Sequence, residues 1–157
     1  MTYRLLLLCL AIACLMASPS SRAEAPARVI PNPAPAYPEL RPVFDEFGGK
    51  DGLKALMDDF MVILLDDPRM RPFFEAVDQQ RVKDKLAEQF CVILGGDCTY
   101  TGMDMVEAHA GMEVHHGDFN ILVEDLQIAM ERRGISTRAQ NQLLAKLAPM
   151  HREVINR

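Results

Sequence analysis

The stretch best suited to carry chemistry is residues 100–112, which contains one histidine, His109. A neutral imidazole is a common protein ligand of iron and of zinc. Met105, Ala108 and Gly111 surround His109 with apolar or small groups, a setting that suits a flat cofactor pressed against the chain. On spacing alone, the favoured interpretation is a core histidine that hydrogen-bonds a backbone carbonyl. The choice between a metal ligand and a core histidine depends on the helices that position His109.

The remaining histidines are interpreted more simply as solvent-exposed residues. His115 and His116 precede a predicted helix as a solvated loop pair, and His151 lies among charged residues near the C-terminus, as a surface residue would. A zinc site that combines His115 and His116 with His109 is the alternative. Zinc takes four defined ligands, however, and no cysteine or acidic residue is suitably spaced. Nucleophile-elbow, phosphate-loop, zinc-protease and EF-hand patterns are all missing from the sequence, so a hydrolase has little support.

Helices are predicted from residue 43 almost to the C-terminus, because apolar residues recur there at spacings of three to four. Asp51, Asp78 and Asp118 are candidate N-terminal caps. The predicted helices span about 51–66, 79–94 and 118–133, followed by a last helix from 136 or 137 that Pro149 bends. Sustained alternation of polar and apolar residues is not seen. The predicted fold class is therefore all-α.

The N-terminus predicts export. A short basic start precedes an apolar run at residues 5–17, which is shorter than the roughly 20 residues that span a membrane. The small residues of Ala23–Glu24–Ala25 then suit a signal-peptidase cleavage site. We therefore expect a signal peptide at 1–25, a Pro/Ala-rich extended tether at 26–42 and a folded domain at 43–157. The alternative is a lipid anchor on Cys14, since Ala11–Cys14 resembles a degenerate lipobox.

Charge and cysteine content narrow the possible partners. The chain has 17 basic and 22 acidic residues, a net charge of −5; the predicted signal removes two basic and one acidic residue, which leaves −6. Such a chain is not expected to bind nucleic acid, because nucleic acid attracts clustered Lys and Arg.

Outside the predicted signal the cysteines are Cys91 and Cys98, separated by a Gly–Gly turn. In an oxidising compartment such a pair favours a disulfide.

Several motifs in order along the chain resemble those of the truncated haemoglobins, specifically their first group. The opening motif resembles the family's but has Phe44 where the family commonly has tyrosine, and His109 falls where the family has its proximal histidine. The resemblance covers about residues 43–154 and requires no gap between Arg81 and Pro149. The matching motifs are Val43–Gly49, Asp58–Phe60, Pro72–Phe74, Gly95–Gly96 with Tyr100–Gly102, and Met105–His109.

This resemblance implies a two-over-two helical sandwich around haem b, with His109 as the axial iron ligand and Phe74 packed on the porphyrin. Arg81, Lys83 and Lys85 are candidate partners of the haem propionates, although they could equally form a solvated face. The residues expected to contact the haem are Phe60, Met61, Phe73, Phe74, Val82, Lys85, Leu86, Phe90, Tyr100, Met105, His109, Leu122, Leu126 and Leu147.

The chain departs from the family on the far side of the haem. Family members commonly place Tyr or Gln there to hydrogen-bond bound oxygen, whereas Met61, Val82 and Leu86 donate nothing. The expectation is a periplasmic, monomeric protein that binds a diatomic gas (oxygen, NO or CO) in an apolar pocket. The alternatives to an unligated apolar pocket are that Gln89 or Lys85 turns towards the bound gas, or that Met61 ligates the sixth position of the iron. The alternative functions are an NO dioxygenase or pseudo-peroxidase that uses the same haem and an external electron donor, and a haem-free helical adaptor or sensor domain.

Overall fold

The computed structural model describes residues 32–156, so the predicted signal at 1–25 and the first residues of the predicted tether lie outside the described part. Every regular element within residues 32–156 is a helix, which confirms the all-α prediction. The elements are η1 (Pro38–Leu40), α1 (Arg41–Glu46), α2 (Gly49–Asp66), α3 (Arg71–Phe74), α4 (Gln79–Ile93), α5 (Met105–Ala108), α6 (His116–Arg132), α7 (Thr137–Leu147), η2 (Ala148–Met150) and α8 (His151–Val154).

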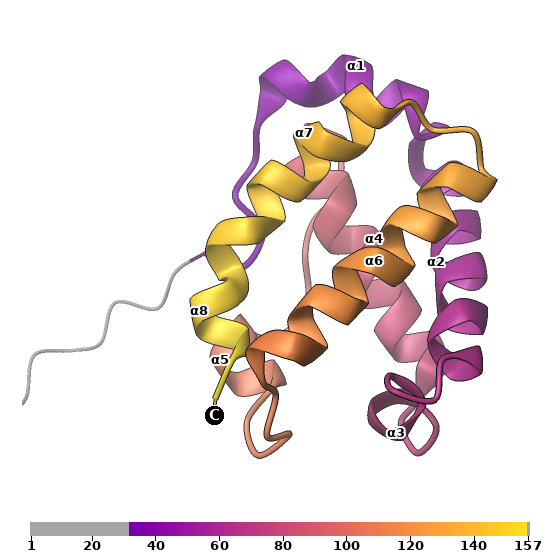
Figure 1. The fold of residues 1–157 in the computed structure, drawn as a ribbon. Coiled ribbons are helices and arrows are strands. Elements are labelled where there is room, and N and C mark those ends of the chain that lie inside the picture. Colours follow the sequence, from indigo (N-terminus) through magenta and orange to yellow (C-terminus); the bar gives the residue numbers. More distant parts are fainter. Residues whose placement is uncertain (1–31, 157) are drawn as a thin grey trace, which may run out of the picture.

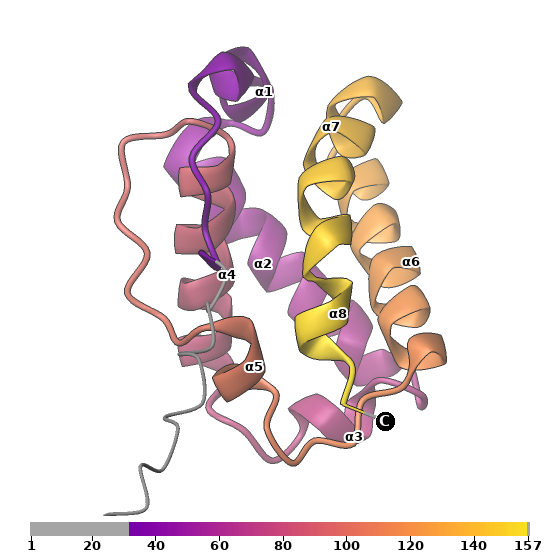
Figure 2. The ribbon, with the colours of Figure 1, turned by 90° about the vertical axis from the view of Figure 1, so that its left-hand side faces the viewer.

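The long helices of the described chain form two layers, as the two-over-two prediction requires. Helix α2 packs on α4 in one layer, and α6 packs on α7 in the other. Contacts of α2 with α6 and of α4 with α7 join the layers. Figure 1 shows α6 and α7 in front of α2 and α4, and the turned view of Figure 2 separates the two layers. The short helices α3 and α5 lie at the same end of the sandwich, on different sides of it (Figures 1 and 2).

The core lies between the layers and is built from the apolar residues that recur at helical spacing in the sequence. Helix α2 buries an almost continuous apolar face from Leu53 to Leu64, and α4 contributes Phe90 and Ile93. Leu143 of α7 is fully buried against them. Removing this apolar surface from water is the main force that holds the layers together.

The folded part begins earlier than the predicted boundary at residue 43. Residues 38–42, predicted as extended tether, form η1 and the first residues of α1. The physical reason is that Leu40 is apolar and packs into the core cluster with 5% of its surface exposed. Gly95 helps this packing because its φ of +73° and missing side chain let the end of α4 approach the chain: a Cβ there would lie 2.8 Å from the Tyr37 carbonyl oxygen.

The predicted caps are partly right. Asp78 caps α4, since its side chain accepts a hydrogen bond from the Arg81 backbone N–H at 3.0 Å. Asp118 does not cap α6: the helix begins two residues earlier, with His115 at the cap position, and the Asp118 carboxylate accepts from the His115 N–H at 2.9 Å. Asp51 lies inside the first turn of α2, which begins after Gly48.

Pro149, which was predicted to bend the last helix, interrupts it. It lies in η2, which separates α7 from α8. The predicted disulfide between Cys91 and Cys98 is present, with the two Cα atoms 6.0 Å apart. It ties the end of α4 to the start of the long segment that leads to α5. None of the helices within residues 32–156 combines the length and the apolar character that crossing a bilayer requires.

Candidate functional site

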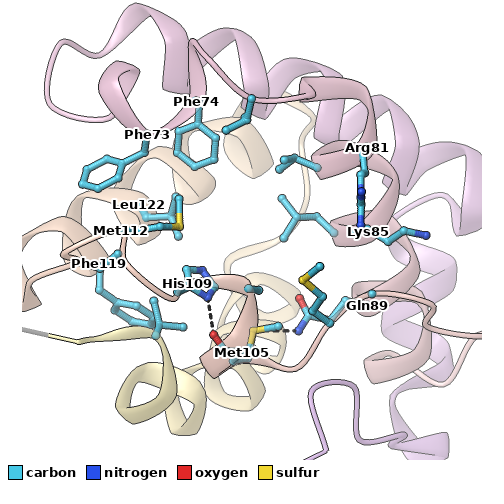
Figure 3. Close-up of a pocket in the computed structure, with 18 of the residues that line it drawn as sticks. Phe73, Phe74, Arg81, Lys85, Gln89, Met105, His109, Met112, Phe119 and Leu122 are labelled. Carbon is cyan, nitrogen blue, oxygen red and sulfur yellow. Dashed lines mark hydrogen bonds between the residues drawn. The ribbon is translucent and has the colours of Figure 1, made fainter.

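A cavity of about 370 Å³ opens at the end of the sandwich where α3 and α5 lie. Its volume falls in the range of pockets that hold small molecules and cofactors. The walls are mostly apolar, and α4 and α5 stand on two of its sides, as Figure 3 shows. The lining residues are Met70, Phe73, Phe74, Val77, Arg81, Val82, Lys85, Leu86, Gln89, Tyr100, Gly102, Met103, Met105, Ala108, His109, Met112, Val114, Asp118, Phe119, Leu122 and Val154.

His109 reaches the cavity from the end of α5. Asp104 starts this short helix by accepting a hydrogen bond from the Glu107 N–H at 2.8 Å, and His109 occupies its C-terminal cap. The Nδ1 atom of His109 lies 2.8 Å from the Met105 carbonyl oxygen, drawn as a dashed line in Figure 3. A carbonyl only accepts, so Nδ1 carries the proton and Nε2 keeps a lone pair. This is the tautomer that a metal ligand needs.

The C-terminal segment braces this part of the chain. The Asn156 side-chain amide donates to the His109 carbonyl oxygen at 2.6 Å. Its backbone N–H donates to the Val114 carbonyl at 3.2 Å. Helix α8 also packs directly on α5. The turn that carries His109 is therefore held from both of its ends, by Asp104 at the start and by the C-terminus behind it.

Most polar side chains of the cavity wall are already engaged within the protein. Gln89 is 4% exposed and donates from Nε2 to the Pro33 carbonyl at 2.6 Å. The Tyr100 hydroxyl donates to the Met103 carbonyl at 2.8 Å. Burial, followed by the charges of Glu88 and Asp104, raises the pKa of Tyr100, so the hydroxyl stays neutral. Neither group is free to meet a ligand.

Lys85 is engaged as well. Its ammonium group lies 3.0 Å from both carboxylate oxygens of Glu88 and also donates to the Thr101 hydroxyl. Glu88 additionally accepts from the Thr101 backbone N–H at 2.9 Å and from its hydroxyl at 2.8 Å. Burial raises the pKa of Glu88, but the hydrogen bonds from Thr101 and Lys85 outweigh it and lower the pKa overall. The carboxylate is therefore charged and holds Lys85 at the edge of the cavity.

Two polar groups on the cavity wall have no hydrogen-bond partner among residues 32–156. One is Nε2 of His109, and the other is the guanidinium of Arg81, which is exposed on α4 and makes no ion pair with any described residue. Lys83, a further candidate for a ligand's acid group, binds Asp58 at 2.6 Å instead and does not line the cavity. The cavity thus offers an apolar interior, an imidazole nitrogen with a lone pair and a cation at its edge.

The structure brings most of the predicted site residues to this cavity. Along its wall lie Phe73, Phe74, Val82, Lys85, Leu86, Tyr100, Met105, His109 and Leu122. The other predicted residues do not line it. Phe60, Phe90 and Leu126 are buried in the core cluster, Leu147 packs against that cluster, and Met61 is buried in α2 with 5% exposure.

The sequence did not predict some of the residues that line the cavity. Met112 and Val114 follow His109 without any helical period, and Val154 comes from the far end of the chain. Phe119 lies one helical turn from Leu122, so the helical spacing of the apolar residues in α6 could have predicted its place in the cavity wall. Only tertiary packing brings the others to the site.

A sandwich of two helix pairs, with a histidine aimed into an apolar cavity, defines a globin of the short type. The fold is that of truncated haemoglobin from Tetrahymena pyriformis, whose Fe(III) form superposes with a TM-score of 0.69 at 23% identity over 73% of this chain and 98% of that one. The chain belongs to the bacterial-like globin family, whose profile matches residues 42–156.

Curated relatives agree with this assignment. A group 1 truncated haemoglobin of Mycolicibacterium paratuberculosis is 29% identical over 112 residues, which cover 71% of this chain and 82% of the relative. One from Chlamydomonas moewusii is 28% identical over 141 residues, covering 88% and 81% respectively. The resemblance found in the sequence motifs is thereby confirmed.

Proposed function

We propose that the cavity holds haem b, that His109 ligates its iron through Nε2, and that the protein binds a diatomic gas there. One observation carries the proposal: the polar groups of the cavity wall that no described residue engages are those that a haem needs. Nε2 of His109 is a metal ligand in the required tautomer, and Arg81 is a cation at the edge. A haem-free adaptor domain has no use for this combination of an imidazole nitrogen and a cation around an apolar cavity.

The residues present fit the group. The interior is lined by Phe73, Phe74, Leu86 and Leu122, which suit the faces of a porphyrin. The Nδ1–H bond to the Met105 carbonyl fixes the ring of His109 and makes Nε2 a better electron donor. Arg81 can pair with a propionate by a charge-assisted hydrogen bond. Lys85 would have to leave Glu88 to do the same, so we assign the propionate contact to Arg81 first.

Haem b supplies an iron at which a diatomic gas binds reversibly. The residues of α4 then set the polarity of the gas side. Val82 and Leu86 line the cavity and donate no hydrogen bond, while Gln89 is directed to the Pro33 carbonyl and Met105. A hydrogen bond to bound oxygen is worth about 1–3 kcal/mol. Without such a donor we expect oxygen to be held weakly relative to CO and NO, which depend less on it.

We also propose that the protein works outside the cytoplasm. The predicted signal peptide is the first support. The Cys91–Cys98 disulfide is the second, because structural disulfides persist in oxidising compartments. Mass determination of the N-terminus from soluble and membrane fractions distinguishes a cleaved periplasmic protein from one lipidated at Cys14. An N-terminus at Met1 in the cytoplasmic fraction would contradict both.

Absorption spectra of the purified chain after haem supplementation test the central proposal. We expect a Soret band in the ferric, ferrous and CO-loaded states at one haem per chain. His109→Ala should abolish stable loading or change the axial ligation, whereas the control His115→Ala, a nearby exposed histidine outside the cavity, should leave the spectra unchanged. No Soret band in the parent chain, or an unchanged spectrum in His109→Ala, would refute the assignment.

A further inference from the structure

A second pair of functional side chains lies outside the cavity, where the first turns of α6 and α8 meet. His116 opens α6 and His151 opens α8, 35 residues later. Their ring nitrogens, Nδ1 of His116 and Nε2 of His151, are 3.0 Å apart. His116 is exposed and His151 half-buried, so solvent reaches the pair. This arrangement departs from the sequence analysis, which treated the two as unrelated surface residues.

Packing holds one of the two rings in place. Phe119, one turn along α6, meets the His151 ring edge-on, with centroids 4.8 Å apart and planes at 89°. The two imidazoles are tilted by 44°, with centroids 4.7 Å apart, so they do not stack. They meet through their nitrogen atoms instead of their faces. The pair is thus an oriented couple of nitrogen donors from two separate helices.

We propose that His116 and His151 form a binding site for a divalent copper ion, separate from the haem cavity. Metal–nitrogen bonds to histidine are about 2.0–2.1 Å long. At that length two nitrogens 3.0 Å apart subtend roughly 90–100° at the metal. Cis ligands of a square-planar ion subtend about 90°, so the two nitrogens can serve as cis ligands of one such ion. Square-planar coordination by nitrogen and oxygen is the preference of Cu(II), which also binds such sites most tightly.

The proton balance allows this without any redox step. In the metal-free protein one of the two nitrogens donates a proton to the other. Copper takes the lone pairs of both nitrogens, and the donor's proton moves to the second nitrogen of its own ring. Within residues 32–156 no three His, Cys, Asp or Glu side chains gather around one point, so water completes the coordination. The expected site is therefore bidentate.

The position of the pair gives the ion a structural effect. It would join the first turn of α6 to α8, and α8 leads directly to Asn156, which hydrogen-bonds the His109 carbonyl oxygen. Copper would therefore stabilise the docking of the C-terminus behind α5. The site does not depend on what the cavity binds, so its test and the test of haem binding fail separately.

The test is a calorimetric titration of the purified chain with CuCl₂, with free thiols blocked beforehand. We expect one copper ion per chain, with EPR hyperfine structure from two equivalent nitrogens. His116→Gln and His151→Gln should each weaken binding at least tenfold, and copper should raise the Tm of the parent chain more than that of either variant. Circular dichroism of the metal-free variants checks that they fold.

His115→Gln is the matched control, because His115 is exposed and adjacent but not part of the pair. It should keep the parent affinity. Equal affinity in the parent and in both pair variants would place the copper elsewhere, for example at the amino terminus, and would overturn the proposal. So would the absence of binding by the parent chain, or an equal loss in His115→Gln.

Discussion

A buried carboxyl on α6 makes the stability of this protein depend on pH. Asp125 is 3% exposed, and its Oδ2 atom has no hydrogen-bond partner among the described residues. Burial, reinforced by the negative charge of Asp67, raises the pKa of Asp125. The nearby cation Arg69 opposes the shift only in part, since its guanidinium already binds Asp67 at 2.5 Å. We predict that Asp125→Asn, which keeps the shape and removes the charge, stabilises the protein at pH 8.

The direction follows from proton linkage. The folded state of the parent binds a proton more tightly than the unfolded chain, whose aspartate titrates near 3.8. The free energy of unfolding therefore falls as pH rises from about that value through the raised folded pKa, and the full cost remains above it. Leaving a buried polar acceptor without a partner costs about 1–3 kcal/mol, and the cost is larger when the acceptor is charged. The asparagine of the variant does not titrate, and its amide is left without a partner as well, so its advantage is the extra cost that the charge adds. This advantage should be greatest at pH 8 and shrink towards pH 4.

Urea unfolding between pH 4 and pH 8, in one state of cofactor loading, measures this difference. Glu131→Gln is the control, because Glu131 is exposed on the same helix and is not among the groups that shift the pKa of Asp125. An exposed charge of this kind contributes little to stability, so the control should follow the parent at every pH. A pH-independent difference between Asp125→Asn and the parent, or a parent that is more stable at pH 8, would refute the reasoning.

Three further changes test the cavity and its supports. Leu86→Gln should place a hydrogen-bond donor on the α4 wall of the cavity and slow oxygen release about tenfold, which corresponds to a hydrogen bond of roughly 1.4 kcal/mol. The rate of CO release should stay nearly unchanged. Stopped-flow ligand exchange measures both rates. Reduction of the Cys91–Cys98 disulfide should cost about 2–3 kcal/mol of unfolding free energy in denaturant titrations, and neither thiol should react with a labelling reagent before reduction. Asn156→Ala removes the bond to the His109 carbonyl and should speed haem loss to an excess of apoprotein acceptor several-fold; an unchanged rate would mean that the C-terminus does not support the site.

The architecture was predictable because it rests on local signals. Leu53, Leu56, Phe60 and Leu64 recur at helical spacing, and the structure buries all four. Asp78 and Pro149 act over a few residues, and both perform their predicted roles. The prediction that Asp118 caps α6 was wrong, because a carboxylate can accept hydrogen bonds either at the cap position or three residues inside the helix. Which position it takes depends on the path of the preceding loop.

The cavity wall was harder to predict, for a physical reason. Periodicity tells that Phe60, Phe90 and Leu126 face inwards, but not whether the inward neighbour is another side chain or a cofactor. In the structure these residues fill the core, and the wall is completed by Met112, which has no periodic signal, and by Val154, which comes from the far end of the chain. A contact between segments far apart in the chain is decided by tertiary packing, which a single sequence does not record.

The assignment of His109 shows the same division more sharply. In the sequence, a histidine bonded to a backbone carbonyl and a histidine bound to a metal were competing interpretations. The structure makes them compatible, since Nδ1 meets the Met105 carbonyl while Nε2 is left for a ligand. The carbonyl bond is what gives the second nitrogen its lone pair, so it supports ligation instead of replacing it. The same accounting separates Arg81 from Lys85: both are cations on α4, but Glu88 and Thr101 hold Lys85, whereas no described residue holds the Arg81 guanidinium back from an acid group. Residue type indicates which side chains could bind a haem, and the hydrogen bonds that each side chain already makes within the protein decide which of them is available.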